Sequence, residues 1–516
     1  MSAFKKLWKL IFGRTTILLL MLLAQALVIF GGFVLINEIL WVNWITGIVA
    51  VIFLLYLMNS KMDSDFKLMW IILILCLPIL GVAFFIFTQF APGSHTKFIR
   101  RRINELEEEQ AEYRKQDQQI MDKIALENKA EIGIFKYLDR QAKFPTYDKA
   151  SVKFFPLGEQ KWEEMLKQLE TAKEFIFMEY FIVERGIMVD PILDILYRKA
   201  QEGVEIRFMY DGTNTLSLLP RSFPQQLKEK GIECKVFSPM KPVLSTHQNN
   251  RDHRKICVID GRCAFTGGVN LADEYINRRE RFGHWKDTAI MVEGEAVNSF
   301  TLMFLQMWNL DAKEHEDYDK YMRHGLLPEL GMRNGGYIVP YGDSPLDNLQ
   351  TGENVYLDII NKSADYVHIM TPYLILDEEV MDALIYAAHR GVDVKIIIPH
   401  IPDKKYAYLL ARSYYRDLIK EGVQVYEYTP GFVHAKIFTS DDVKAVVGTI
   451  NLDFRSLYLH FECAAYMWKN PVVYDIEADF QDTLAKSQNV TMEDYMKMNV
   501  FGKLAATLLR FIAPLM

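Results

Sequence analysis

The chain of 516 residues contains the same α/β sequence pattern twice, and this duplication constrains its fold more than any other feature. Three segments of one copy resemble three segments of the other in the same order: Ala172–Ile182 and Ala364–Ile375, Ala200–Asp211 and Ala388–Pro399, Leu227–Pro239 and Leu418–Pro430. In both copies short β-branched runs alternate with amphipathic helical runs, a pattern typical of strand, helix, strand, helix, strand. The sequence therefore predicts two α/β units, each of a common domain size.

A short polar motif is duplicated as well. Each copy has the spacing His-x-Lys-x4-Asp, followed by an asparagine at a fixed offset: His253, Lys255, Asp260 and Asn270, then His434, Lys436, Asp441 and Asn451. One such pattern could arise by chance in a chain of this length. Two patterns in register within a repeat could hardly do so, which indicates a shared role.

The histidine and lysine of each motif stand two residues apart in a sequence typical of a strand. Side chains two apart point to the same face, so each pair projects together. A lone histidine in an apolar strand is usually a core residue, and packing or surface exposure suits the histidines at other positions: His95, His315, His324, His368, His389 and His400. A face with two cationic groups is a poor core and a good oxyanion site, so we expect both pairs to carry chemistry.

The first ninety residues contain three apolar runs, at 15–36, 40–58 and 68–87, each long enough to cross a bilayer as a helix. We expect a multi-pass membrane protein in which residues 1–96 form two or three spanning helices. A cleaved signal peptide is the alternative for the first run, although that run is long and lacks a convincing cleavage site. Basic clusters at both ends favour the cytoplasm, which requires an even number of crossings and conflicts with three runs. The number of crossings stays open, and we expect a cytoplasmic main domain.

The rest of the chain divides into regions of different composition and periodicity. Residues 97–145 are charge-rich and helical, which predicts a solvated linker helix. The α/β repeats then occupy 146–335 and 336–490, and 491–516 form an amphipathic C-terminal helix that lies on the membrane or simply packs on the protein. Five cysteines without CxxC spacing favour neither a disulfide framework nor a structural zinc site.

The paired motifs resemble those of the phospholipase D superfamily. More narrowly, the apolar N-terminal runs, the contexts of both motifs and the C-terminal segment 508–516 are similar to bacterial cardiolipin synthases over nearly the whole chain. This resemblance implies an α/β fold class with N-terminal transmembrane helices followed by two phospholipase D-like α/β/α repeats, related by a pseudo-twofold axis and sharing one active site in the bacterial cell membrane. The extra apolar run departs from the usual two spans and unsettles the topology.

Displacement at a phosphodiester suits such a site. One neutral imidazole attacks phosphorus to form a phosphohistidine, while the other, protonated, donates to the departing oxygen. The pattern in relatives favours His253 as the nucleophile and His434 as acid and base. Non-bridging oxygens would be bound by the motif lysines and asparagines: Lys255, Lys436, Asn270 and Asn451.

Several acidic residues are candidates for supporting roles. Asp260 and Asp441 belong to the motifs, and we expect them to support the fold around the site rather than to move protons. A histidine nucleophile needs an acceptor on its second nitrogen, and Asp287 and Glu462 stand where superfamily members place a carboxylate. Glu179 and Tyr373 are expected to occupy matching repeat positions and to line the pocket, although core packing explains Tyr373 nearly as well. No cofactor or metal is expected, because the chain has no His-Glu-x-x-His motif and no P-loop.

Membrane lipid is the expected substrate. The resemblance implies condensation of two phosphatidylglycerol molecules to cardiolipin and glycerol. A phospholipase D-type hydrolase and another phosphatidyltransferase remain alternatives, because water competes with the lipid alcohol. A scaffold with a decayed catalytic fold is a third alternative, against which the intact motifs argue. A net charge of -7 without a basic stripe disfavours nucleic acid.

Overall fold

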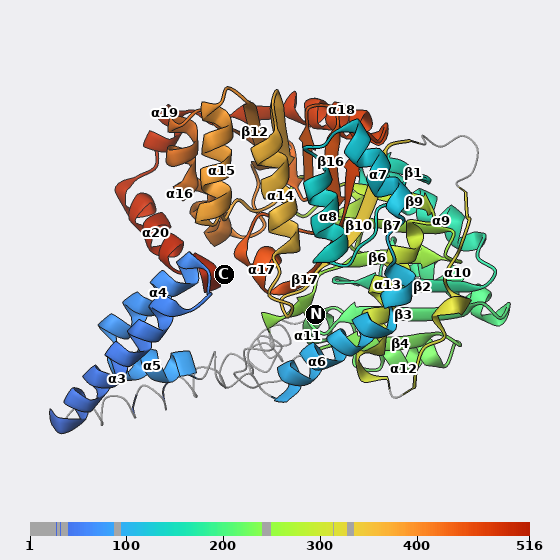
Figure 1. The fold of residues 1–516 in the computed structure, drawn as a ribbon, viewed down its shortest axis with the longest axis horizontal. Helices are drawn as coiled ribbons and strands as arrows, with labels where there is room; N and C mark the ends of the chain where they lie inside the picture. The colour runs from blue at the N-terminus through green and yellow to red at the C-terminus, as the bar shows by residue number, and fades with distance from the viewer. Residues whose placement is uncertain are drawn as a thin grey trace, which may run out of the picture.

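A computed structural model describes Leu27, Gly31 and residues 40–86, 94–239, 249–312, 314–327 and 335–515. The main body contains two mixed α/β units side by side, and a helical arm made of α3, α4 and α5 extends from it (Figure 1). This arrangement confirms the mixed α/β class that the duplicated sequence predicts.

The two central sheets have the same strand order. The first runs β1 (Ala150–Phe155), β9 (Ala289–Gly294), β7 (Cys263–Gly267), β6 (Lys255–Ile259), β2 (Phe175–Tyr180), β3 (Glu205–Asp211) and β4 (Glu233–Phe237). The second runs β10 (Tyr337–Asp343), β17 (His460–Trp468), β16 (Lys444–Gly448), β15 (Ile437–Ser440), β11 (Tyr366–Met370), β12 (Asp393–Pro399) and β13 (Gln424–Tyr428), then β18 (Ser487–Asn489). Strands β2, β3 and β4 are parallel, as are β11, β12 and β13. The order of elements repeats strand by strand.

Helices join the parallel strands as the sequence pattern predicts. In the first unit α10 (Val189–Gln201) follows β2, and α12 (Phe223–Lys228) precedes β4. In the second, α15 (Glu378–His389) and α16 (Lys405–Lys420) occupy the corresponding places. A parallel pair needs such a crossover, since a tight turn cannot connect its strands.

The units exchange short strands at their junction. Strand β5 (Arg251–Asp252) of the first unit pairs with β17 of the second. Strand β14 (Gly431–Val433) of the second pairs with β8 (His284–Lys286) of the first. Each exchanged strand comes directly before a His-x-Lys motif, so the junction brings both motifs together.

The N-terminal arm differs from the expected series of single spans. The run 40–58 falls in α3 (Leu40–Asn59), but the run 68–87 is split between α4 (Ser64–Cys76) and α5 (Pro78–Phe85). Pro78 stands at the start of α5, where its missing N–H is tolerated and the preceding residue is turned away from helix. In the described part of the chain, no helix combines the length and the apolar character needed to cross a membrane. The first run lies outside the described residues, apart from Leu27 and Gly31.

The segment expected to be one solvated linker helix contains several packed elements. These are α6 (Ser94–Glu109), a 3-10 turn at Ala111–Arg114, α7 (Gln118–Glu127) and α8 (Ile132–Arg140). Their apolar stripes join the main core through Leu106, Ile124, Phe135 and Leu138, all fully buried. The charges therefore mark the outer faces of packed helices rather than a free linker. At the C-terminus, α19 (Met492–Met496) precedes the amphipathic helix α20 (Val500–Phe511).

Candidate active site

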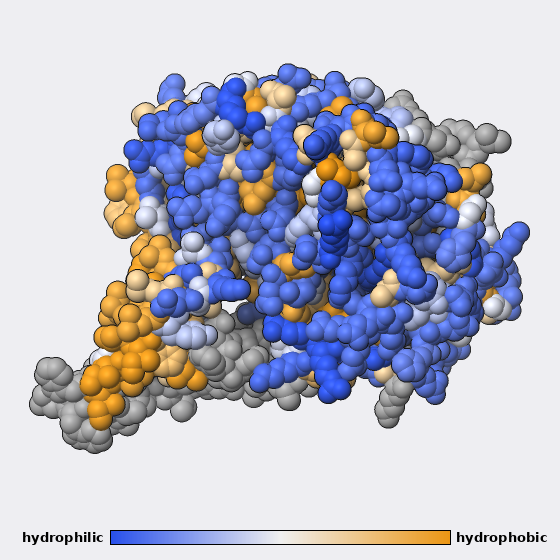
Figure 2. Space-filling view, in the orientation of Figure 1, coloured by the Kyte–Doolittle hydropathy of each residue, from blue (hydrophilic) through white to orange (hydrophobic). Residues whose placement is uncertain are grey.

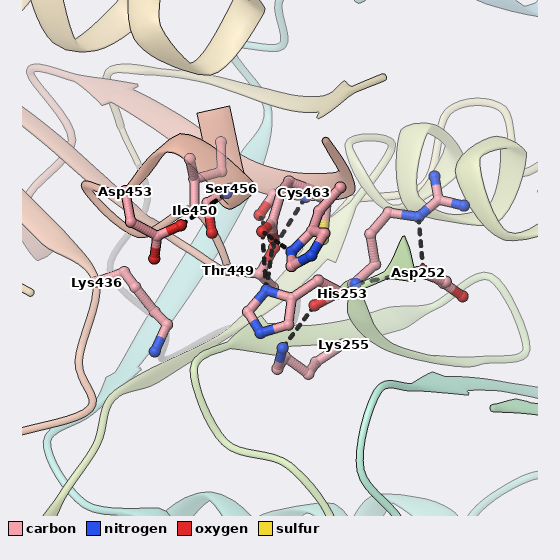
Figure 3. Close-up of polar contacts among 12 residues, drawn as sticks. Asp252, His253, Lys255, Lys436, Thr449, Ile450, Asp453, Ser456 and Cys463 are labelled. Atoms are coloured by element: carbon pink, nitrogen blue, oxygen red, sulfur yellow. Dashed lines mark hydrogen bonds and ion pairs between the residues drawn. The ribbon is translucent and has the colours of Figure 1, made fainter. Parts of the chain in front are cut away.

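Each motif histidine is fixed by a backbone hydrogen bond to the other unit. The His253 N–H donates to the Phe461 carbonyl oxygen at 2.9 Å, and the His434 N–H donates to the Lys286 carbonyl oxygen at 2.7 Å. Both histidines are only 7% exposed. The motifs were expected within strands, but His253 lies between β5 and β6, and His434 and Lys436 lie between β14 and β15 (Ile437–Ser440). The amino groups of Lys255 and Lys436 point into the same region as the His253 ring (Figure 3).

A carboxylate of the opposite unit contacts each imidazole. Nδ1 of His253 lies 2.8 and 3.0 Å from the two carboxylate oxygens of Glu462, and Nδ1 of His434 lies 2.7 Å from Oδ2 of Asp287. An ionised carboxylate only accepts, so Nδ1 of His253 carries the proton and Nε2 keeps a lone pair. Nδ1 of His434 also lies 3.0 Å from Nζ of Lys436, and we assign its proton to Nδ1 as well because the contact with Asp287 is the shorter one. The expected orienting carboxylates thus lie beside the histidines. Each carboxylate contacts the histidine of the other unit.

The surroundings fix these carboxylates in turn. Asp287 accepts a hydrogen bond from the Thr288 N–H at 2.8 Å, and Glu462 accepts one from the Thr449 hydroxyl. Gly268 makes room for Asp287, because a Cβ at this position would lie 2.0 Å from Oδ1 of that carboxylate. These contacts hold each imidazole in one tautomer and one orientation.

Burial controls the protonation of the histidines. Loss of solvent lowers the pKa of His253 to about 3 despite the attraction of Glu462, and it lowers the pKa of His434 to about 4. Burial alone would raise the pKa of Glu462, but the attraction and hydrogen bond of His253, the contact with His460 and the Lys255 charge hold that pKa below its usual range. The free site at neutral pH therefore holds two neutral imidazoles, one of them beside an ionised carboxylate.

The motif lysines are buried cations within the same cluster. The Lys255 ammonium donates to the His253 carbonyl oxygen at 2.5 Å, and the Lys436 ammonium donates to the His434 carbonyl oxygen. Burial lowers the pKa of Lys255 to about 8 and that of Lys436 to about 7, where Lys255 adds repulsion. Asp287 and Glu462 partly offset the effect of burial on both lysines. Neither amino group forms an ion pair with a carboxylate within the described part of the chain, so both can bind phosphate oxygens.

The motif aspartates lie at turns away from this cluster. Asp260 accepts hydrogen bonds from three successive backbone N–H groups, those of Lys173, Glu174 and Phe175, each at 2.8 Å. Asp441 binds the corresponding three, those of Ala364, Asp365 and Tyr366, each at 2.9 Å. Both aspartates have positive φ, 53° and 54°, in a left-handed turn that Asp tolerates. The geometry fits the expected supporting role.

The two asparagines differ in their surroundings. In Asn270, Oδ1 accepts from the Ile182 N–H at 3.0 Å and Nδ2 donates to the Tyr275 hydroxyl at 2.9 Å. In Asn451, Oδ1 is buried and has no hydrogen-bond partner within the described part of the chain. Asn270 is thus tied to the protein at both ends of its amide, while Asn451 retains capacity to bind a ligand.

Glu179 and Tyr373 do not occupy matching repeat positions. The two aspartate turns align Phe175 with Tyr366, which places Glu179 opposite Met370. Glu179 is fully buried and accepts from Nε of Arg254 at 2.8 Å, so it neutralises a core arginine that the sequence pattern did not single out. Tyr373 does line a surface pocket, with Phe432 and Asp403. Tyr373 lies three residues beyond Met370, the position that matches Glu179.

The aromatic surroundings of the two histidines are unequal. The rings of Tyr275 and Trp285 lie 5.3 and 5.5 Å from that of His434. The His253 ring lies 5.4 Å from that of His460, which stands two residues before Glu462. The sequence analysis did not single out His460, although the spacing His460-x-Glu462 on one strand was a usable signal.

Comparison with known proteins agrees with this geometry. The family model "Cardiolipin synthase, PLD-like domain" matches residues 165–308 and 356–484, which is one stretch in each unit. The chain belongs to this family. It is 32% identical to a cardiolipin synthase of Alkalihalophilus pseudofirmus over 92% of its own length and 95% of that protein. It is 50% identical to an uncharacterized protein of Streptococcus mutans over 90% of its length and 99% of the relative.

A solved structure shares the fold at low sequence identity. The phosphatidylserine synthase of Haemophilus influenzae superposes with a TM-score of 0.53 and 14% identity, covering 71% of this chain and 93% of that one. This likeness supports the fold alone. Family membership makes the chain a phosphatidyltransferase enzyme of the phospholipase D superfamily.

Proposed function

We propose that the protein is a membrane-bound cardiolipin synthase, which transfers a phosphatidyl group from one phosphatidylglycerol to another. The reciprocal histidine–carboxylate pairs are the observation that supports this proposal. Each pair presents an Nε2 lone pair in a buried site that also contains two lysine amino groups. The family relatives named as cardiolipin synthases supply the substrate class.

In the first step Nε2 of His253 attacks phosphorus. A phosphorus–nitrogen bond forms, the bond to the headgroup glycerol oxygen breaks, and protonated His434 gives that oxygen its proton. The Lys255 and Lys436 ammonium groups bind the non-bridging oxygens, whose charge grows in the transition state. Glycerol leaves, and the phosphatidyl group stays on His253.

In the second step the acceptor lipid takes the place of glycerol. His434, now neutral, removes the proton of the terminal hydroxyl of a second phosphatidylglycerol, and the oxygen attacks phosphorus as the bond to His253 breaks. One phosphodiester replaces another, so no nucleotide is needed.

The cycle requires one charged and one neutral histidine, whereas the free site holds two neutral ones. A bound phosphodiester places a negative charge beside both rings and favours the protonated form of the acid. We assign the nucleophile to His253 and the acid to His434 from the pattern in relatives.

Exposed apolar side chains on the helical arm and on α20 support membrane attachment. An apolar surface covers α3 and α4 and reaches towards α20 (Figure 2). It includes Ile48, Val51, Ile52, Leu55, Met58, Leu68, Leu75, Val500, Phe501, Leu504 and Leu508, each more than half exposed. Such a continuous patch marks an interaction surface, and a lipid layer is the partner that the substrate class favours.

The arm is attached close to the site. The Phe66 ring of α4 packs at 5.8 Å from Phe454 and 5.7 Å from Tyr458, both in α17 (Phe454–Tyr458). Helix α17 begins three residues after Asn451. A membrane that covers the arm would therefore lie near the entrance for lipid.

The test uses purified protein in phosphatidylglycerol vesicles without nucleotide, with lipid products followed by mass spectrometry. We expect cardiolipin and glycerol in equal amounts, and loss of both in His253→Ala and His434→Ala. His389→Ala, which changes an exposed histidine paired with Glu421, is the matched control. Phosphatidic acid as the main product would instead identify a hydrolase, and unchanged lipid would contradict the proposal.

A further inference from the structure

His460 is a buried histidine for which the proposed reaction has no use. Its side chain is 10% exposed, and both ring nitrogens are buried without a hydrogen-bond partner in the described part of the chain. A buried imidazole normally has at least one partner, because an unmade hydrogen bond costs free energy. With Glu462 as its nearest carboxylate at 3.8 Å, the His460 ring keeps the capacity to bind a ligand.

The donor atoms around His460 suit a transition-metal ion. His253, His460 and Glu462 each offer one ligand atom, and these atoms lie within 4.8 Å of one another. Oε1 of Glu462 lies 2.8 Å from Nδ1 of His253 and 3.8 Å from Nδ1 of His460. Zinc–ligand distances of about 2.0–2.2 Å place two ligands of a tetrahedral ion about 3.4 Å apart, between these two values. Small side-chain shifts would complete a His₂Glu set with an open fourth position.

We propose that His253, His460 and Glu462 form an inhibitory site for Zn²⁺ or a similar borderline divalent ion. The ion binds the Nδ1 lone pair of His253, so the single proton of this neutral imidazole moves to Nε2. Nε2 then carries a hydrogen instead of the lone pair that attacks phosphorus. The metal thus stops phosphatidyl transfer by imposing the wrong tautomer, and no proton is gained or lost overall.

The corresponding position beside His434 cannot bind a metal ion in this way. Trp285 is the residue of the first unit that corresponds to His460, since Gly267 pairs with Ala289 as Gly448 pairs with Ala464. An indole N–H donates and offers no lone pair to a metal. The site is therefore expected to bind one ion per chain, on the His253 side.

Cobalt binding tests the site without reference to activity. The untagged full chain in detergent, without lipid, is titrated with Co²⁺, and visible absorption is recorded. We expect the intense bands of four- or five-coordinate Co²⁺ at one ion per chain, and their loss in His460→Trp and His460→Gln. His389→Gln, which removes an exposed histidine 3.0 Å from Glu421, should leave the bands unchanged. Only the weak spectrum of hydrated Co²⁺ with the wild type, or equal bands in the His460 variants, would overturn the proposal.

Zinc inhibition of lipid transfer then tests whether the bound ion blocks the reaction. This experiment alone rests on the proposed function. Both His460 variants should retain transfer in chelated buffer. Removing a residue that hydrogen-bonds to a metal ligand lowers metal affinity by about 10- to 100-fold. Because His460 is itself a proposed ligand, its loss should raise the half-inhibiting Zn²⁺ concentration at least tenfold. Equal inhibition of wild type and variants would refute the site. If no cardiolipin forms at all, the proposed function fails while the cobalt result still stands.

Discussion

At the residue scale, the most consequential contact is the one between each motif imidazole and the carboxylate of the opposite unit. Glu462→Gln preserves shape but can present an amide N–H to Nδ1 of His253, which then favours the tautomer protonated at Nε2. The corresponding change in a serine protease triad costs about 10⁴ in turnover. We expect the turnover number for cardiolipin formation to fall by about 10³–10⁴ with little change in KM, measured in phosphatidylglycerol vesicles.

Asp287→Asn should act in the same way on His434. A matched control is Glu477→Gln, which alters a carboxylate 2.8 Å from Nδ1 of His368 on a strand outside the site. A turnover number that stays within a few-fold of the wild type in Glu462→Gln would contradict the orienting role.

The same two histidines make stability depend on pH. Their folded-state pKa values of about 3 and 4 lie below the ordinary value of 6.5, so the unfolded chain binds more protons than the folded one between these limits. The free energy of unfolding therefore rises with pH from about 4 to 6.5. Thermal unfolding of His253→Gln with His434→Gln should show a shallower slope over this window, while equal slopes would mean that the two imidazoles do not titrate as described.

At the element scale, the aspartate turns hold the start of β2 in the first unit and of β11 in the second. Asp441→Ala leaves three backbone N–H groups of the strand entrance without their acceptor, and it places alanine in a left-handed turn. We expect a loss of about 1–3 kcal/mol in the free energy of unfolding, seen as a lower melting temperature. Asp441→Asn keeps one acceptor oxygen and should lose less.

This prediction separates a supporting role from a catalytic one. Asp441→Ala that remains folded at low temperature should keep near wild-type turnover, because Asp441 does not contact the histidines. A large loss of turnover with an unchanged melting temperature would assign the aspartate to the chemistry instead.

The elements also show what the sequence could and could not predict. The two units follow from local periodicity. The His-x-Lys pairs are recognisable by their spacing, but the expected strand is interrupted at His253 and from His434 to Lys436. The partner of each histidine does not, because Glu462 reaches His253 only through the pairing of β5 with β17 across units. The correct alignment of Glu179 with Met370 comes from the equivalent turns at Asp260 and Asp441, which residue similarity did not show. The many charged residues of α6 and α7 led to the prediction of a solvated linker, although the apolar faces of both helices pack into the core.

At the scale of the whole molecule, the apolar arm and α20 have to present the site to a lipid surface. Val500 and Phe501 are 79% and 83% exposed at the start of α20. Full burial of a side chain such as Phe contributes about 1.5–3 kcal/mol, and 1.4 kcal/mol corresponds to tenfold in an equilibrium. Val500→Glu with Phe501→Glu should therefore raise the KM for phosphatidylglycerol in vesicles at least tenfold.

The chemistry itself should not change in this variant. Short-chain phosphatidylglycerol below its micelle concentration reaches the site from solution, so its turnover should equal that of the wild type. Leu126→Glu is the matched control, because Leu126 is 89% exposed on α7, which lies apart from the arm and α20 in Figure 1. An equal loss with both substrates would mean that α20 supports the fold rather than the contact with lipid, while no loss with vesicles would leave the helical arm as the sole attachment.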